Sequence, residues 1–186
     1  MTSPSQRSAI LDARAITRAL EHMASGITEL AGKDGAKNLM LIGIQRRGVE
    51  LADRIAQLIT ARTGAQVSRG ALDITLYRDD LATVGPKPLV GETHIPGELA
   101  GKCVVIVDDV LYTGRTIRAA LDELADFGRP ARIGLAVLID RGGRELPIQA
   151  DVIGETVKAA KGDRVDVFLT ELDGKDVVEL VKGAGS

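Results

Sequence analysis

Apolar residues in the first part of the chain recur at alternating spacings of four and three, which is the period of one helix face. This stripe follows Asp12 at an N-cap position, predicts a helix over about residues 12–30, and consists of Ile16, Leu20, Met23, Ile27 and Leu30. A second stripe starts at Val49 and stops near Gly64, which predicts a second helix. Each helix would bury one face and leave the other in solvent.

Three unbroken apolar runs are too short for helices and are bounded by residues that break helices. They predict buried strands at Leu39–Ile44, 103–107 and 133–139. A helical pattern covers about residues 116–127, and weaker strand patterns occupy residues 67–77, 152–153 and 165–169. Strands that alternate with helices in this way indicate an α/β fold, with an open, mainly parallel sheet and helices on both faces.

The segment from Tyr77 to Gly101 interrupts this alternation. Prolines and glycines recur along it, and neither a helical nor a strand period persists. A loop of this length inside a compact domain is usually either functional or disordered. The pattern alone leaves both possibilities open for this segment.

Length and composition describe an ordinary globular chain. With 186 residues, a single domain over residues 1–186 is expected. Lys and Arg number 24 and Asp and Glu number 26, so the net charge of −2 argues against a generally basic coat for nucleic acid but permits a local basic patch. The absence of Trp, with two Tyr and two Phe, disfavours aromatic platforms that stack on bases.

The cysteine content and the apolar runs bear on the compartment. Cys103 is the single cysteine, which excludes an intramolecular disulfide framework and a multi-cysteine zinc site. No apolar stretch reaches the roughly 18 residues of a membrane span, and the opening MTSPSQRSAI lacks the apolar region of a secretory signal. We therefore expect a cytoplasmic protein that does not enter a membrane, with Cys103 as a thiol of the core.

The most informative chemistry follows the run that ends at Val107. In a parallel sheet, ligands bind beyond the carboxyl ends of the strands. Asp108 and Asp109 stand there, and residues 113–116 lie where the loop enters the next helix. Backbone N–H groups and two hydroxyls would converge on this point, which suits a phosphate monoester. The two acids, expected in an exposed loop, would accept hydrogen bonds from sugar hydroxyls or contact hydrated Mg²⁺.

Another class of protein remains possible from these residues alone. A buried strand that ends in two acids also occurs in phospho-acceptor receiver domains, and a Thr-Gly pair before a helix is often only a cap. Receiver domains, however, carry the acids after their first strand, near the start of the chain, whereas here about a hundred residues precede them. A Rossmann dinucleotide site is disfavoured because no G-x-G-x-x-G follows a predicted strand.

The string VVIVDDVLYTGRT at residues 104–116 resembles the phosphoribosyl pyrophosphate (PRPP) motif of the type I phosphoribosyltransferases. Three further segments resemble the branch of that family whose members regulate pyrimidine operons and are also uracil phosphoribosyltransferases: LDITLYRDDL at 72–81, GIQRRG at 43–48 and LAVLIDRGGRELPIQAD at 135–151. The similarity spans about residues 8–180. It implies the type I phosphoribosyltransferase fold, with a small hood from the N- and C-terminal parts and a flexible loop at about 77–101.

This resemblance implies that uracil and PRPP give UMP and pyrophosphate, with Mg²⁺ held mainly by the substrate's own oxygens. Asp108 and Asp109 would bind the ribose 2′- and 3′-hydroxyls and would meet the metal only indirectly, through Mg–PRPP. The residues that cradle the 5′-phosphate would be Thr113, Gly114, Arg115 and Thr116. The same loop would contact substrate through Val110, Leu111 and Tyr112.

The resemblance also implies cationic groups for the leaving pyrophosphate. Arg46 and Arg47 would contact it from the turn after the first buried strand, although family members commonly carry a small hydroxyl residue in place of Arg46. Arg78 would reach it from the flexible loop as the loop closes over PRPP and excludes water. With Asp108 and Asp109, Arg47 and Arg78 complete the predicted catalytic set, which acts by positioning and charge stabilisation rather than by proton transfer.

The base would lie against Ile139, Asp140 and Arg141, in a region that resembles the family's hood. Backbone groups there can read the uracil carbonyls and N3–H. No side chain stands out as a general base for uracil N1. A purine phosphoribosyltransferase remains an alternative. So does a regulator with little turnover.

Regulatory members of this branch bind a hairpin of the pyr leader mRNA through a basic face, and uridine nucleotides strengthen that binding. Arg18, Arg141 and Arg144 remain as candidates for RNA contacts in this chain. The family's usual His, Arg and Lys are replaced here by Gly143, Gln149 and Glu155. RNA binding is therefore a weaker expectation than the enzyme activity. A homodimer or a larger homo-oligomer is also implied.

Overall fold

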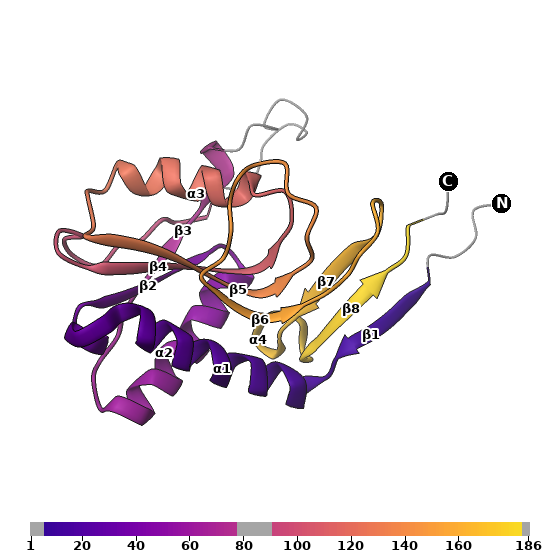
Figure 1. Cartoon of the computed structure of the whole chain (residues 1–186), viewed down its shortest axis with the longest axis horizontal. Helices are drawn as coiled ribbons and strands as arrows, with labels where there is room; N and C mark the ends of the chain where they lie inside the picture. The colour runs from indigo at the N-terminus through magenta and orange to yellow at the C-terminus, as the bar shows by residue number, and fades with distance from the viewer. Residues whose placement is uncertain (1–5, 78–90, 184–186) are drawn as a thin grey trace.

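The computed structural model describes residues 6–77 and 91–183 and shows a five-stranded parallel sheet between two layers of helix (Figure 1). The strand order is β3-β2-β4-β5-β6. These strands are β2 (Leu39–Ile44), β3 (Ser68–Leu72), β4 (Cys103–Leu111), β5 (Arg132–Asp140) and β6 (Val152–Thr156). The helices that cover them are α1 (Ala13–Ala31) and α2 (Arg47–Thr63) on one face and α3 (Arg115–Ala125) on the other. The predicted fold class is confirmed.

Alternating residues of the central strand divide the core between the two faces. Val105 and Val107 of β4 pack in the cluster that contains α1 and α2, whereas Val104 and Ile106 pack in the cluster that contains α3. All four side chains are fully buried. A strand covered on both faces needs apolar side chains at every position, which explains why these runs are unbroken. The core is aliphatic, as the composition requires.

Local sequence fixes most element boundaries. The Asp12 carboxylate accepts a hydrogen bond of 2.8 Å from the Ala15 N–H and caps α1, as its position predicted. Strand β2 has the predicted bounds, and Gly64 ends α2 with a left-handed conformation. Helix α2 begins at Arg47, however, two residues earlier than the apolar stripe indicated. Arg47 is therefore a helical residue rather than a loop residue.

Strand β4 is longer than predicted. The apolar run stops at Val107, but backbone pairing with β5 continues through Asp108, Val110 and Leu111. The expectation that the two acids lie in an exposed loop is therefore wrong, because strand pairing continues past the end of the apolar run. Strand β3 is shorter than the pattern over 67–77 suggested, and a 3₁₀ turn, η2 (Ile74–Tyr77), follows it.

A second, antiparallel sheet joins the N- and C-terminal parts of the chain and lies beside the carboxyl ends of the main strands in Figure 1. Its strands are β1 (Arg7–Leu11), β8 (Val177–Val181) and β7 (Arg164–Phe168), and the short helix α4 (Thr170–Asp173) connects β7 to β8. The resemblance implied a hood from these same parts of the chain. We call this sheet with α4 the hood.

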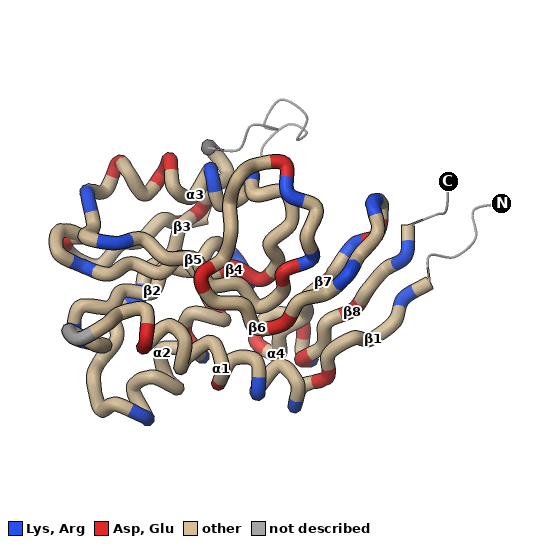
Figure 2. The backbone as a smooth tube through the Cα atoms, in the orientation of Figure 1, with Lys and Arg blue, Asp and Glu red and all other residues tan. Residues whose placement is uncertain are grey.

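Another short helical segment, η1 (Gly32–Lys37), links α1 to β2. Of the predicted flexible loop at about 77–101, residues 78–90 lie outside the described residues. The part that follows pairs His94 with Ala71 of β3 through two backbone hydrogen bonds of 2.8 Å. Across residues 6–77 and 91–183, no helix is long and apolar enough to cross a membrane. Figure 2 shows acidic and basic residues spread over most of the elements.

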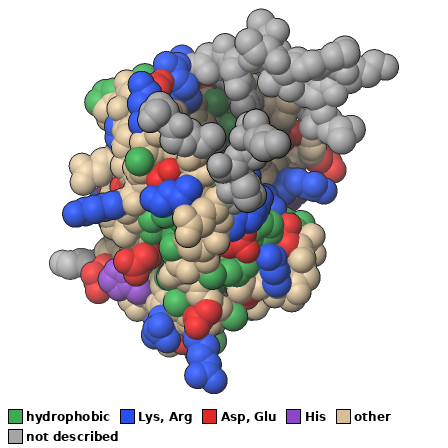
Figure 3. All heavy atoms as spheres, turned by 90° about the vertical axis from the view of Figure 1, so that its right-hand side faces the viewer, with side chains coloured by type: hydrophobic (Ala, Val, Ile, Leu, Met, Phe, Trp, Pro, Cys, Tyr) green, Lys and Arg blue, Asp and Glu red, His purple; other side chains and the backbone are tan. Residues whose placement is uncertain are grey.

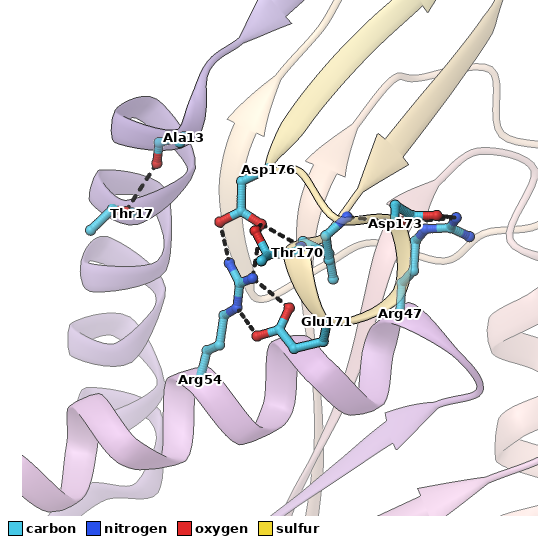
Figure 4. Close-up of polar contacts among 9 residues, drawn as sticks. Ala13, Thr17, Arg47, Arg54, Thr170, Glu171, Asp173 and Asp176 are labelled. Atoms are coloured by element: carbon cyan, nitrogen blue, oxygen red, sulfur yellow. Dashed lines mark hydrogen bonds and ion pairs between the residues drawn. The ribbon is translucent and has the colours of Figure 1, made fainter.

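The hood is tied to α2 by a cluster of ion pairs around Arg54 (Figure 4). Both Arg54 Nη atoms lie 2.8 Å from oxygens of Asp176, and its Nε lies 2.8 Å from Glu171 Oε1. Arg54 and Asp176 are 20% and 16% exposed, so water screens the pair only in part. The bidentate geometry is the strongest form of an Arg–carboxylate contact.

This pair predicts a pH-dependent part of the stability. Hydrogen bonds from Arg54 lower the pKa of Asp176 to about 2, although burial acts in the opposite direction. A depressed folded-state pKa stabilises the fold above the unfolded pKa of about 4, and this stabilisation is lost as the pH falls towards 2. We expect Asp176→Asn to lower the free energy of unfolding at pH 7 by about 2 kcal/mol.

Urea unfolding of both proteins from pH 7 to pH 2 measures this difference, which should shrink below about pH 4. The matched control is Asp53→Asn, which removes an exposed pair with Arg69 and should cost less than about 1 kcal/mol at any pH. A loss from Asp176→Asn that is the same at every pH would contradict the electrostatic explanation.

Candidate active site

The carboxyl ends of β2, β4 and β5 bring three predicted segments to one edge of the sheet. The backbone at the start of α2 packs directly against the end of β4. A Cβ atom on Gly48 would lie 2.4 Å from the Val107 carbonyl oxygen, and one on Gly43 would lie 2.4 Å from the Gly48 carbonyl oxygen. Only glycine permits this approach, so Gly43 and Gly48 place the turn at residues 45–46 beside the acids.

Asp108 and Asp109 form a pair of neighbouring carboxyl groups in β4. Asp108 is 7% exposed, and Asp109 is half-buried. Each carboxylate accepts the N–H of the next residue, at 2.9 Å from Asp109 N and 2.8 Å from Val110 N. These bonds orient the two side chains along the strand edge.

Burial raises the pKa of both acids. For Asp108 the neighbouring charge of Asp109 adds to the effect of burial, so ionising both groups together is costly. For Asp109 the Val110 N–H and the Arg47 guanidinium oppose burial and limit the rise in pKa. Such a pair favours a ligand that supplies hydrogen-bond donors or positive charge.

The loop after the acids enters α3 through Gly114. Its φ of +92° is left-handed, and a Cβ there would press on Leu146 and Ile148 at 3.3–3.4 Å. Because Gly114 has no side chain to cap α3, the helix start is open to an anion. Thr113 is half-buried and its hydroxyl lies 3.3 Å from the Arg115 N–H, whereas Arg115 and Thr116 are exposed.

A second loop, residues 144–148, supports this turn. The N–H groups of Glu145 and Leu146 donate to the Thr113 carbonyl at 3.0 and 3.1 Å. The Glu145 carboxylate lies 2.8 Å from Arg115 Nε. Val110 is half-buried, Leu111 is buried, and the exposed Tyr112 stands between the acids and Thr113. The structure therefore presents the predicted motif as one continuous strand, loop and helix.

Arg46 and Arg47 differ in their surroundings. Arg46 is exposed, and the peptide bond that precedes it is cis. Arg47 is the first residue of α2, and its Nη2 lies 3.0 and 3.2 Å from the two carboxylate oxygens of Asp173 in α4. Sequence reasoning did not find Asp173, because 126 positions separate it from Arg47 along the chain. No local pattern reports a pairing of that kind.

Arg141 is largely a structural residue. Its side chain is 7% exposed, and it donates to the carbonyls of Asp163 and Ala160 at 2.7 and 3.2 Å. Its guanidinium also covers the Tyr112 ring, 3.9 Å from the centroid. The Arg141 side chain therefore leaves little exposed surface for an RNA contact, and that role stays a prediction.

Arg144 is also engaged within the protein. Its three nitrogens donate to the carbonyls of Ile148 and Tyr112 at 2.8 and 3.0 Å and to the Asp140 carboxylate at 2.5 Å. Burial favours neutral Asp140, but the Arg144 and Gly142 donors outweigh it and lower its pKa. Ile139 is fully buried. Of the predicted RNA contacts, Arg18 alone presents an exposed side chain in the described part of the chain.

Arg78 lies outside the described residues, so its role stays a prediction. Within the described ranges no group of three or more His, Cys, Asp or Glu side chains could hold a metal ion. Asp108 and Asp109 supply hard oxygen ligands. A pair of carboxylates suits a metal that arrives with a substrate better than a metal that the protein holds by itself.

Comparison with known proteins places this site in a family. The profile of the phosphoribosyl transferase domain matches residues 6–167. Among solved structures, the hypoxanthine phosphoribosyltransferase of Trypanosoma cruzi has a TM-score of 0.71 at 17% identity, covering 95% of this chain and 97% of that chain. A hypoxanthine phosphoribosyltransferase from Staphylococcus aureus gives a TM-score of 0.68 at 17% identity, covering 94% and 92%. At this identity the two structures establish the fold alone.

Closer relatives narrow the assignment. "Bifunctional protein PyrR" of Deinococcus radiodurans is 52% identical and covers 97% of this chain and 96% of its own length. The protein of the same name from Chloroflexus aurantiacus is 54% identical, with 95% and 96% covered. The chain therefore belongs to the phosphoribosyl transferase family and, within it, to the PyrR proteins. The predicted family is confirmed.

The acids that are proposed to bind the ligand should lower the stability of the free protein. Because burial raises the pKa of Asp108, its ionised form costs folding free energy once the pH exceeds the unfolded pKa of about 4. Asp108→Asn removes that cost and keeps an oxygen for the Asp109 N–H. We expect it to raise the free energy of unfolding at pH 7 by about 0.5–2 kcal/mol, with little gain at pH 3.

Denaturant unfolding at both pH values is the measurement, and Asp122→Asn on the exposed face of α3 is the control, with no expected gain. Destabilisation by Asp108→Asn at pH 7 would show that the pair stabilises the free protein instead.

Proposed function

We propose that the chain is a uracil phosphoribosyltransferase that converts uracil and PRPP to UMP and pyrophosphate, and that it also regulates pyrimidine operon mRNA in response to UMP. The observation that supports the enzyme activity best is the arrangement of two neighbouring carboxyl groups, one buried and one half-buried, a few residues before an uncapped helix start. Relatives that share about half of its residues over nearly the whole chain carry the name bifunctional.

The residues divide the substrate between them. The N–H groups and hydroxyls of residues 113–116 bind the 5′-phosphate, and the two acids accept the ribose 2′- and 3′-hydroxyls. Uracil N1 then forms a bond to C1′ as the bond from C1′ to pyrophosphate breaks, and the N1 proton passes to solvent. C1′ gains cationic character in between, which the carboxylates of Asp108 and Asp109 favour. Arg47 favours the negative charge on the departing group.

PRPP would carry Mg²⁺ into the site, where the ion would neutralise charge on the pyrophosphate oxygens. Asp108 and Asp109 are the residues that would meet it, through the bound substrate.

The base lies against the backbone at the end of β5. There the Arg141 N–H donates to the Leu111 carbonyl at 3.2 Å, and the Val157 N–H donates to the Asp140 carbonyl at 2.9 Å. These bonds and the Arg141 side chain hold the segment that reads uracil.

RNA binding rests on fewer groups than the resemblance implied. Arg18 presents an exposed cation on α1, whereas Arg141 and Arg144 donate hydrogen bonds to backbone carbonyls within the protein. Gly143, Gln149 and Glu155 are all exposed, so the replaced positions lie on the surface where RNA contacts would form. We propose a weak, salt-dependent RNA interaction, and a homodimer or larger assembly in the cytoplasm.

The activity is tested by mixing the protein with Mg²⁺, PRPP and one nucleobase at a time. We expect UMP with uracil and no nucleotide with hypoxanthine or guanine. Asp109→Asn should reduce UMP formation by about 100-fold, since it removes one charge that stabilises the cationic sugar. Nucleotide formed only from a purine would reassign the substrate. Phosphorylation by acetyl phosphate without any nucleotide product would favour a receiver domain.

A filter-binding titration against a pyr leader transcript tests regulation. Binding should weaken between 50 and 200 mM salt, roughly in proportion to the phosphates contacted, and should strengthen with UMP. Arg18→Ala should weaken it and lower the salt slope by about one. Arg129→Ala, at the opposite end of the sheet, is the matched control. Absent or salt-insensitive binding would remove the regulatory part of the proposal.

A further inference from the structure

The Arg47 side chain is held in one orientation, whereas an exposed arginine samples many. Its Nη2 contacts both oxygens of Asp173, at 3.0 and 3.2 Å, so this bridge occupies one of its three guanidinium nitrogens. Its Nε is buried and has no hydrogen-bond partner among the described residues. The two side chains are 34% and 19% exposed. This is an oriented cation beside the acid pair, rather than one that moves freely in solvent.

Asp173 is itself fixed within the hood. Its Oδ2 accepts the Leu169 N–H at 2.9 Å, so the carboxylate closes the turn that carries it. Helix α4 has four residues, which is too short to be stable without tertiary contacts. The position of Asp173 therefore depends on what anchors α4.

That anchor is Arg54, seven positions after Arg47 and hence on the same face of α2 (Figure 4). Arg54 pairs with Glu171 of α4 and with Asp176 just beyond it. Asp176 also accepts the N–H and hydroxyl of Thr170, at 2.7 and 2.8 Å, at the start of α4. Arg54 thus secures both ends of α4, and the bridge between Arg47 and Asp173 is not needed to attach the hood.

The remaining role for that bridge is at the site. We propose that Asp173 is a positioning residue, which orients the Arg47 guanidinium towards the leaving pyrophosphate, and that Arg54 holds α4 in the place this requires. An arginine that is already oriented loses less side-chain freedom when the transition state forms. The proposal rests on the proposed function and adds that the hood contributes to the chemistry through α4.

The test is a double-mutant cycle between Asp173 and Arg47. Asp173→Asn keeps an oxygen for the Leu169 N–H, so α4 should stay folded while the charge on Arg47 loses its partner. We expect kcat with uracil and PRPP to fall by about 10-fold, with a smaller change in the KM for PRPP and little change in Tm. Arg47→Ala should lose more, and the double variant should equal Arg47→Ala, because Asp173 acts only through Arg47.

Asp166→Asn, in β7 of the hood, is the matched control. Its ion-pair partners Arg7 and Arg164 are 49% and 63% exposed and do not contact α4, so kcat should stay within about 2-fold of the wild type. If the two losses multiply in the double variant, or if Asp173→Asn leaves kcat unchanged, the positioning role is overturned.

The same double-mutant cycle between Asp173 and Arg47 can be measured by calorimetry as changes in the affinity for pyrophosphate. This measurement separates the positioning role from the proposed function. Asp173→Asn should weaken pyrophosphate binding in the wild type and have no further effect in Arg47→Ala. A wild-type protein that forms no UMP would overturn the function, while coupling in pyrophosphate binding would still support the positioning role. Independent effects on pyrophosphate, or no pyrophosphate binding by the wild type, would overturn the positioning role whatever the turnover.

Discussion

Asp108 and Asp109 place two carboxyl groups side by side in a strand that helices cover on both faces, where ionising both is costly. Several surrounding features of the structure relate to this cost. Gly43 and Gly48 bring the start of α2, and with it the charge of Arg47, close to the acids. An uncapped helix start stands a few residues further on. The free protein therefore holds a site whose charges are balanced only when a polyhydroxyl, anionic ligand and its cation arrive.

Most of the other polar contacts at this edge keep its loops in place. Arg141 and Arg144 bind backbone carbonyls from residues 112, 148, 160 and 163. Both arginines were predicted to contact RNA, and in the structure both hold the loops around the proposed substrate site. Figure 3 views the molecule from the side on which the hood lies and shows acidic and basic side chains around apolar areas on the described part of that face.

How far the sequence predicts this structure depends on whether a feature is local. Strand β2 and helix α1 follow from unbroken apolar runs, from helical spacing and from the cap at Asp12, all read within a few positions. The acids were misplaced in a loop because strand pairing continues past the end of the apolar run. Strands β1 and β8 are short, and each is stabilised by pairing with a distant segment. The contact between Arg47 and Asp173 has no local signature at all.

The central claim is that the acids and the helix start together bind an activated ribose phosphate. Its most direct test is a calorimetric titration of PRPP into the protein, with and without Mg²⁺, repeated with Gly114→Ala, which should displace the loop at the left-handed position. The account predicts saturable, Mg²⁺-dependent heat for the wild type and a much weaker interaction for the variant. No Mg²⁺-dependent heat, or equal affinity in both proteins, would contradict it.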